Sequence, residues 1–136
     1  MSMLSTVAND KRPFKGKGAE WLEKVEREYE RIVYDMEELA EQSRRGAGSP
    51  WYVYMHFRKE TAQHFLMWRS FGVKHVHLRW DSMQSLLERM TESQRSGYVS
   101  INEALRLLNA KEKAARTALN LAKGLMNGIS AHERER

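Results

Sequence analysis

Residues 51–80 of this chain gather the side-chain types that bind nucleic acid. Eight of the 13 aromatic residues and four of the five histidines lie in this stretch. It also holds five lysine or arginine residues against a single acid, Glu60. Aromatic rings stack on unpaired bases, and cationic side chains neutralise phosphates. This composition, flanked by helical patterns, suggests a surface that binds nucleic acid.

The spacing within this stretch predicts which side chains share a surface. Residues 51–59 alternate, with Trp51, Val53, Met55 and Phe57 on one side, which is typical of a half-buried strand. Further strands are expected at 64–70 and 74–80. The candidate nucleic-acid-binding residues are basic, aromatic or histidine side chains expected to face outward or to flank that face: Tyr52, Tyr54, His56, Arg58, Arg69, His75, His77 and Arg79. Lys15 and Lys17 of a basic N-terminal arm would assist them.

Two structural questions about this face stay open in the sequence. In the alternative arrangement a helix covers the face, and the tyrosines belong to the core. The facing of the second strand is also ambiguous, because Phe65 and Met67 compete with Leu66 and Trp68 for the core.

A long helix is expected before the strands, over residues 19–42. Its apolar residues recur at helical spacing, from Trp21 to Ala40, and RRGAGSP ends it. This helix holds nine acids and three bases, a net charge of −6, so the remainder of the chain carries +11. The asymmetry indicates either a surface that steers a polyanion to one side or an ordinary solvated helix face.

The chain after the strands is expected to be helical in two segments. Asp81 or Ser82 would cap a shorter helix that the stretch TESQRSG ends. Ser100 and Glu103 have the spacing of a capping box before a last helix from Ile101 to about Asn127, with Gly128 as the stop. A helix-turn-helix with its turn at Leu108–Ala110 is the alternative, although no residue there is a stronger helix breaker than Asn109.

These elements predict an α+β fold. Long N-terminal and C-terminal helices would pack antiparallel with a three-stranded antiparallel meander and one shorter helix. The expected organisation is a flexible basic arm at 1–18, a single domain at 19–130 and a polar tail at 131–136. At 136 residues the chain is long enough to bury a core without disulfides.

Several functional classes find little support in the sequence. No catalytic motif has its required local context, so we expect no enzyme and no cofactor. His56, His75 and His77 lack a cysteine or further ligand, so no metal site is expected. The absence of cysteine, of a signal-peptide core and of a long apolar run predicts a cytoplasmic protein without membrane contact.

Two segments together resemble a protein family. Pro13-Phe14-Lys15-Gly16-Lys17-Gly18 precedes a Trp-bearing helix, Phe65-Leu66-Met67-Trp68-Arg69 lies near the middle, and a Leu/Ala-rich helix closes the chain. This order resembles an uncharacterised domain family of integrative conjugative elements, over roughly residues 12–130. The helix–meander–helix order is also loosely similar to MobI-type mobilisation proteins, which assist DNA processing at a transfer origin. Both resemblances imply a mobile element, and neither implies an active residue.

The functional expectation is a non-enzymatic accessory protein of a plasmid or conjugative element that binds nucleic acid, DNA rather than RNA, through the aromatic and basic sheet face. The first alternative is an adaptor or inhibitor that binds a host or element-encoded protein. The second is the helix-turn-helix DNA-binding regulator. The alanine-rich last helix also leaves a homodimer open.

Overall fold

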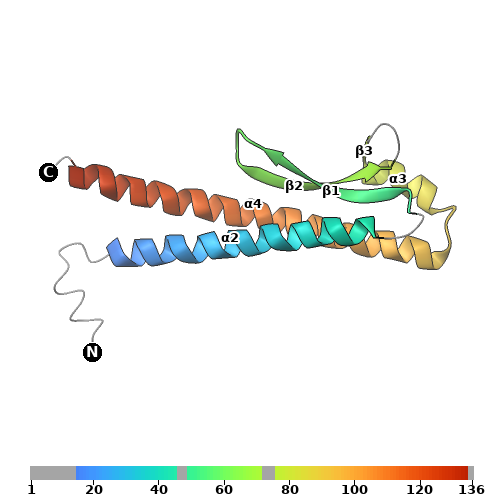
Figure 1. The fold of residues 1–136 in the computed structure, drawn as a ribbon, viewed down its shortest axis with the longest axis horizontal. Helices are drawn as coiled ribbons and strands as arrows, with labels where there is room; N and C mark the ends of the chain where they lie inside the picture. Colours follow the sequence, from blue (N-terminus) through green and yellow to red (C-terminus); the bar gives the residue numbers. More distant parts are fainter. Residues whose placement is uncertain (1–14, 46–48, 72–75, 135–136) are drawn as a thin grey trace, which may run out of the picture. The chain divides into compact units, whose positions relative to one another are not determined.

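The protein has an α+β fold, with long N-terminal and C-terminal helices, a shorter helix between them and a three-stranded antiparallel sheet (Figure 1). The computed structural model describes residues 15–45, 49–71 and 76–134, with only the main chain for residues 15 and 129–134. The described elements, in chain order, are α2 (Lys15–Arg44), β1 (Trp51–Arg58), β2 (Gln63–Ser70), β3 (His77–Leu78), α3 (Trp80–Leu87) and α4 (Glu92–Arg134). The predicted fold class is confirmed.

The chain divides into two compact units, and both long helices contribute to each. The first unit contains α2 up to Glu30 and α4 from Ala115 onward. The second unit spans Arg31–Ala114 and therefore contains the whole sheet, α3 and the remaining parts of α2 and α4.

The first unit is a pair of helical segments that run in opposite directions, as expected from the sequence. Val25 of α2 and Ala122 of α4 are its buried side chains with apolar character, together with the small Gly18. Small residues let two helix backbones approach closely, which is the role expected of the alanines of α4.

The second unit buries one face of the sheet. The core residues of β1 and β2 are Trp51, Val53, Leu66 and Trp68. Side chains from three helices are buried in the same unit: Ile32 and Met36 of α2, Met83 and Leu87 of α3, and Leu105 of α4. The pairing of β1 with β2 places these strand residues on the same side, which we call the covered face.

Polar side chains of α4 hold β2 in place along the part of its edge that β3 leaves free. β3 pairs only with Trp68 and Arg69. Beyond that point Asn109 accepts a hydrogen bond from the Leu66 N–H at 2.8 Å and donates to the Leu66 carbonyl at 3.0 Å. The buried Glu112 accepts from the His64 N–H at 2.8 Å. These bonds satisfy main-chain groups that a further strand would otherwise pair.

A buried side-chain contact and a helix end fix the other parts of the sheet. The Trp68 Nε1–H donates to Asn102 Oδ1 of α4 at 3.0 Å, so this donor and this acceptor satisfy each other in the core. At the end of α2, Ser43 Oγ donates to the Ala40 carbonyl and accepts from the Val53 N–H. The open edge of β1 is thereby joined to α2.

The N-terminal boundary differs from the sequence expectation. α2 begins at Lys15 rather than at residue 19, so the last four residues of the predicted flexible arm are helical. Gly16 and Gly18 lie inside the helix, and Gly18 is buried, which indicates that packing outweighs the low helix propensity of glycine. Residues 1–14 of the predicted arm lie outside the described residues.

The C-terminal helix also differs from the expectation. TESQRSG does not end a helix but begins α4, and the capping box consists of Thr91 and Gln94 rather than Ser100 and Glu103. α4 continues through Asn109 and Gly128 to Arg134. The helix-turn-helix alternative required a break near Asn109, so it is wrong. Asn109 faces β2 and makes the two bonds described above.

The third strand and the shorter helix meet earlier than expected. β3 contains only His77 and Leu78 among the described residues, and Trp80 belongs to α3 rather than to the strand. The N-cap of α3 is Arg79, which makes no side-chain capping bond, rather than Asp81 or Ser82. Val76 was expected in the core but is exposed.

Candidate functional site

The sheet face opposite the core brings together most of the residues predicted to bind nucleic acid. Strand pairing joins Tyr52 to Arg69, Tyr54 to Met67, His56 to Phe65 and Arg58 to Gln63, and it joins Arg69 to His77. Paired residues lie on the same side of a sheet. We call this surface the open face; it consists of Tyr52, Tyr54, His56, Arg58, Gln63, Phe65, Met67, Arg69 and His77.

The open face is accessible except at one end. In the second unit, α2 and α4 lie against the other side of the sheet (Figure 1). Arg58, Phe65 and His77 are exposed, and Tyr54 and His56 are partly exposed. Tyr52 was expected to face solvent but is only 3% exposed, because Phe71 and Arg44 pack against its ring. Tyr52 therefore belongs to the core, as in the alternative arrangement, whereas the other members of the open face have exposed or partly exposed side chains.

Arg69 is fixed on this face by two neighbours. Its guanidinium carbon lies 3.7 Å from the centre of the Tyr54 ring, and its Nη2 lies 3.0 Å from His77 Nε2. A guanidinium group only donates hydrogen bonds, so His77 Nε2 acts as the acceptor and its proton resides on Nδ1. Among the described residues, the Arg69 Nε is a buried donor without a partner.

Two hollows lie on the open face. One, which we call the guanidinium hollow, is lined by Arg44, Tyr52, Tyr54, Arg69 and Phe71. The other is lined by His56, Arg58, Gln63, Phe65 and Met67. Their centres are separated by four residues along β1, which corresponds to about 13 Å at the usual rise of a strand.

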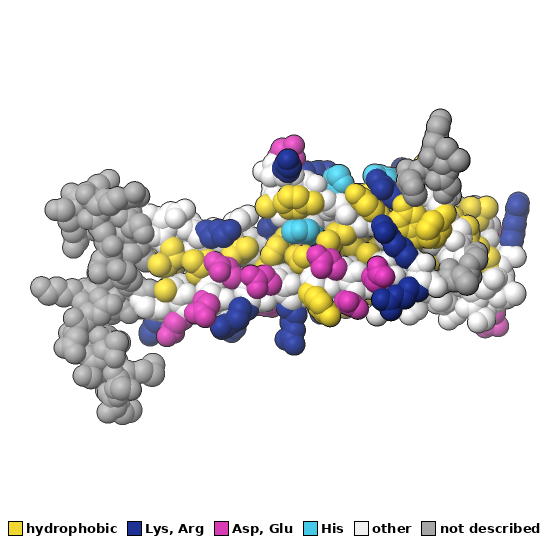
Figure 2. All heavy atoms as spheres, in the orientation of Figure 1, with side chains coloured by type: hydrophobic (Ala, Val, Ile, Leu, Met, Phe, Trp, Pro, Cys, Tyr) yellow, Lys and Arg dark blue, Asp and Glu magenta, His cyan; other side chains and the backbone are white. Residues whose placement is uncertain are grey.

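The open face carries no carboxylate. Its nine members include two arginines and two histidines but no aspartate or glutamate. In Figure 2 histidine, basic and hydrophobic side chains gather over the strands, with acidic atoms at their upper end, whereas a row of acidic side chains follows α2. Such a face attracts an anion and offers aromatic surface beside the charge.

Three described residues of the predicted set, His77, Arg79 and Lys17, line neither hollow. Arg79 is exposed and immediately precedes α3. His75 lies outside the described residues, as does the side chain of Lys15. Lys17 is exposed on α2 in the first unit and therefore belongs to a different compact unit from the open face.

Sequence reasoning missed several residues that line the hollows: Arg44, Gln63, Phe65, Met67 and Phe71. For those of β2, a usable signal existed in the length of the turn. Four residues, 59–62, separate Arg58 from its partner Gln63, so even-numbered residues of β1 pair with odd-numbered residues of β2. No comparable local signal points to Arg44 or Phe71, which reach the hollow from outside the strands.

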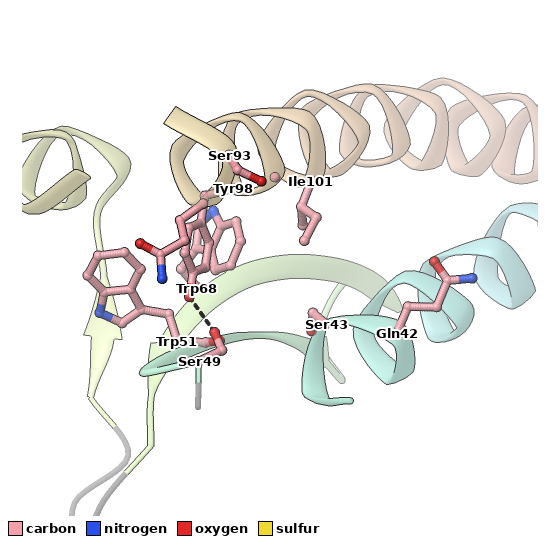
Figure 3. Close-up of a pocket in the computed structure, with 10 residues that line it drawn as sticks. Gln42, Ser43, Ser49, Trp51, Trp68, Ser93, Tyr98 and Ile101 are labelled. Atoms are coloured by element: carbon pink, nitrogen blue, oxygen red, sulfur yellow. Dashed lines mark hydrogen bonds between the residues drawn. The ribbon is translucent and has the colours of Figure 1, made fainter. Parts of the chain in front are cut away.

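A separate cavity of about 230 Å³ lies on the covered side of the sheet (Figure 3). The rings of Trp51, Trp68 and Tyr98 gather at one end of it, and Ser49 Oγ is hydrogen-bonded to the Tyr98 hydroxyl. Serine and glutamine side chains complete the lining together with Gly97 and Ile101, without a charged residue or a histidine. The lining holds no aspartate, glutamate, histidine or lysine, and we assign it no reaction.

Other site types were sought among the described residues. No group of three or more His, Asp or Glu side chains within residues 15–45, 49–71 and 76–134 has a geometry that would hold a metal ion.

Among these described residues, none of the helices carries an apolar stretch long enough to span a lipid bilayer.

Comparisons with protein-family models, with curated proteins and with solved structures gave no match to this chain.

Proposed function

We propose that this protein binds single-stranded nucleic acid, DNA in preference to RNA, through the open face and without catalysing a reaction. Unpaired bases would stack on the accessible rings, and the arginines would contact phosphates. Stacking requires bases that are not already paired, which is the reason for proposing a single strand.

The observation that carries this proposal is a sheet face that combines accessible aromatic rings with arginines and lacks any carboxylate. Phe65 is 40% exposed, and the partly exposed Tyr54 has one face of its ring against the Arg69 guanidinium. A face covered by a helix, or one balanced by acids, would not support nucleic-acid binding. The two hollows, spaced along β1, provide positions for successive parts of one strand.

We further propose that the protein serves a plasmid or an integrative conjugative element. The support is the resemblance of the PFKGKG and FLMWR segments to the domain family of such elements. FLMWR is part of β2, and its alternate residues Phe65, Met67 and Arg69 lie on the open face. One of the two segments that carry the resemblance thus also supplies part of the proposed contacts.

Two phenylalanines of the hairpin provide a matched test. Phe65 and Phe57 are 40% and 48% exposed, but Phe65 lies on the open face and Phe57 on the opposite one. Fluorescence anisotropy would measure binding to mixed-sequence single-stranded DNA, duplex DNA and RNA at two salt concentrations. We expect F65A to weaken single-strand binding by about 1–3 kcal/mol, roughly 5- to 150-fold, and F57A to leave it unchanged.

Either of two results would contradict the proposal. The first is no detectable binding of any polymer by the unmodified protein at low salt, where phosphate contacts are strongest. The second is an equal loss for F65A and F57A, with both variants folded by circular dichroism, because it would mean that the open face makes no specific contact.

Binding of a host or element-encoded protein is a second candidate function, which exposed leucines in the first unit favour. Leu121 and Leu125 are 63% and 48% exposed and lie one turn apart on α4. Exposed apolar side chains at this spacing are typical of a helix that docks on a partner. Under this alternative, replacement of Leu121 by lysine abolishes partner binding, whereas F65A has no effect on it.

A further inference from the structure

The guanidinium hollow has the composition of an anion site. Two of its five lining residues are arginines and three are aromatic, and no acid lines it. Among the described residues, neither Arg44 nor Arg69 forms an ion pair with a carboxylate. By contrast the neighbouring Arg45 pairs with Glu41 at 3.5 Å. Two guanidinium groups in one hollow repel each other unless an anion lies between them.

The two guanidinium groups pack against aromatic rings through their flat faces, and these ring contacts do not use their N–H donors. Arg69 lies over the Tyr54 ring at 3.7 Å, and Arg44 lies over the Tyr52 ring at 4.9 Å. Stacking of this kind uses the π face of the group and not its N–H donors. Arg69 donates an N–H from Nη2 to His77, and its Nε is buried without a partner among the described residues, so Arg69 would meet a ligand in the hollow through its Nη groups.

A base-stacking surface adjoins the charged groups. Phe71 is 46% exposed, and its ring centre lies 4.5 Å from that of the buried Tyr52. The Tyr52 ring thus packs against one side of the Phe71 ring, and the accessible part of the Phe71 ring borders the hollow.

We propose that the guanidinium hollow binds one backbone phosphate of the strand, shared between Arg44 and Arg69, with the adjoining base against Phe71. This inference rests on the proposed function, since it takes the anion to be part of a nucleic acid. A phosphodiester has two terminal oxygens that can each accept from a different guanidinium group, and hydrogen bonds of this type are charge-assisted. An acidic peptide supplies carboxylates but no base for Phe71.

Adjacent arginines at the end of α2 supply the variant and its control. Arg44 lines the hollow, whereas Arg45 is exposed, pairs with Glu41 and does not line it. With single-stranded oligothymidylate, we expect R44A to lower affinity about tenfold at low salt and to reduce the salt slope by about 0.7, the value for one phosphate contact. R45A should leave the slope unchanged.

Sharing of one phosphate predicts that the two arginines act together. R69A should reduce the slope as R44A does, and the double variant should reduce it no further. Arg69→Lys retains the charge but lacks the planar fork, so we expect it to retain the slope and to lose part of the affinity. Equal slopes for R44A and R45A, with the unmodified protein still binding the oligonucleotide, would overturn the phosphate site and leave the proposed function standing.

Titration with inorganic phosphate, followed by the NMR resonances of the Tyr54 and Phe71 rings, separates the two proposals further. Saturable shifts that disappear in R44A, in a protein that binds no oligonucleotide, would support the hollow as a phosphate site and contradict the proposed function. No shift with phosphate and no oligonucleotide binding would overturn both. Tighter binding of polyglutamate than of oligonucleotide, lost in R44A, would replace the phosphate by an acidic peptide and overturn the inference.

Discussion

The side-chain amide of Asn109 in α4 makes two hydrogen bonds to the main chain of one residue, Leu66 of β2. Its Oδ1 lies 2.8 Å from the Leu66 nitrogen and its Nδ2 lies 3.0 Å from the Leu66 oxygen. The side chain therefore takes the place of a neighbouring strand where β3 has ended. Since Leu66 points into the core, its neighbours Phe65 and Met67 point to the open face.

Replacement of Asn109 by alanine should destabilise the protein by about 1–3 kcal/mol in urea unfolding. Two part-buried main-chain groups lose their partner, and each such loss costs about 1 kcal/mol or more. Asn120→Ala is the control, because Asn120 is exposed on the same helix and experiences the same gain in helix propensity. If both variants had the same unfolding free energy, the contact with Leu66 would contribute nothing to stability.

The fold class and β1 could be predicted from the sequence because the hydrophobic pattern of these segments matches one structural period. Trp51 and Val53 alternate with Tyr52 and Tyr54, and only one side of the strand enters the sheet-helix core. In β2 both sides are apolar, so periodicity cannot choose between Phe65 and Leu66. The register, which the four-residue turn sets, makes that choice.

The boundaries of the helices were harder to predict because packing overrides local propensity. Gly97 lies within α4 although a glycine there costs about 1 kcal/mol relative to alanine. The next residue, Tyr98, packs its ring at 5.0 Å from Trp51 and 5.9 Å from Trp68, distances between ring centres. Long-range contacts of this kind, like those that bring Arg44 and Phe71 to the guanidinium hollow, leave no periodic signal in the sequence.

The start of α4 gives a prediction that distinguishes the observed capping box from the one expected from sequence. The Gln94 N–H donates to Thr91 Oγ1 and the Thr91 N–H donates to Gln94 Oε1, each at 3.2 Å. We expect Thr91→Ala to lower the free energy of unfolding by about 1 kcal/mol. Ser100 lies in the helix interior, so Ser100→Ala should be neutral or slightly stabilising. Thermal unfolding of both variants measures the difference, and a larger loss for Ser100→Ala would restore the expected boundary.

The turn that sets the register of the hairpin contains a residue with a strained backbone. Relief of this strain should change the free energy of unfolding. Ala62 has a φ of 55°, which lies in the left-handed region that side chains with a Cβ disfavour. Ala62→Gly should therefore raise the free energy of unfolding by about 0.5–1 kcal/mol, even though glycine gains more entropy on unfolding. Ala110→Gly on the exposed side of α4 is the control and should lower it by about 1 kcal/mol. Because Ala62→Gly should leave the strand pairing intact, we expect it to leave oligonucleotide binding by the open face unchanged. A loss of binding would mean that the strained turn itself contributes to the site.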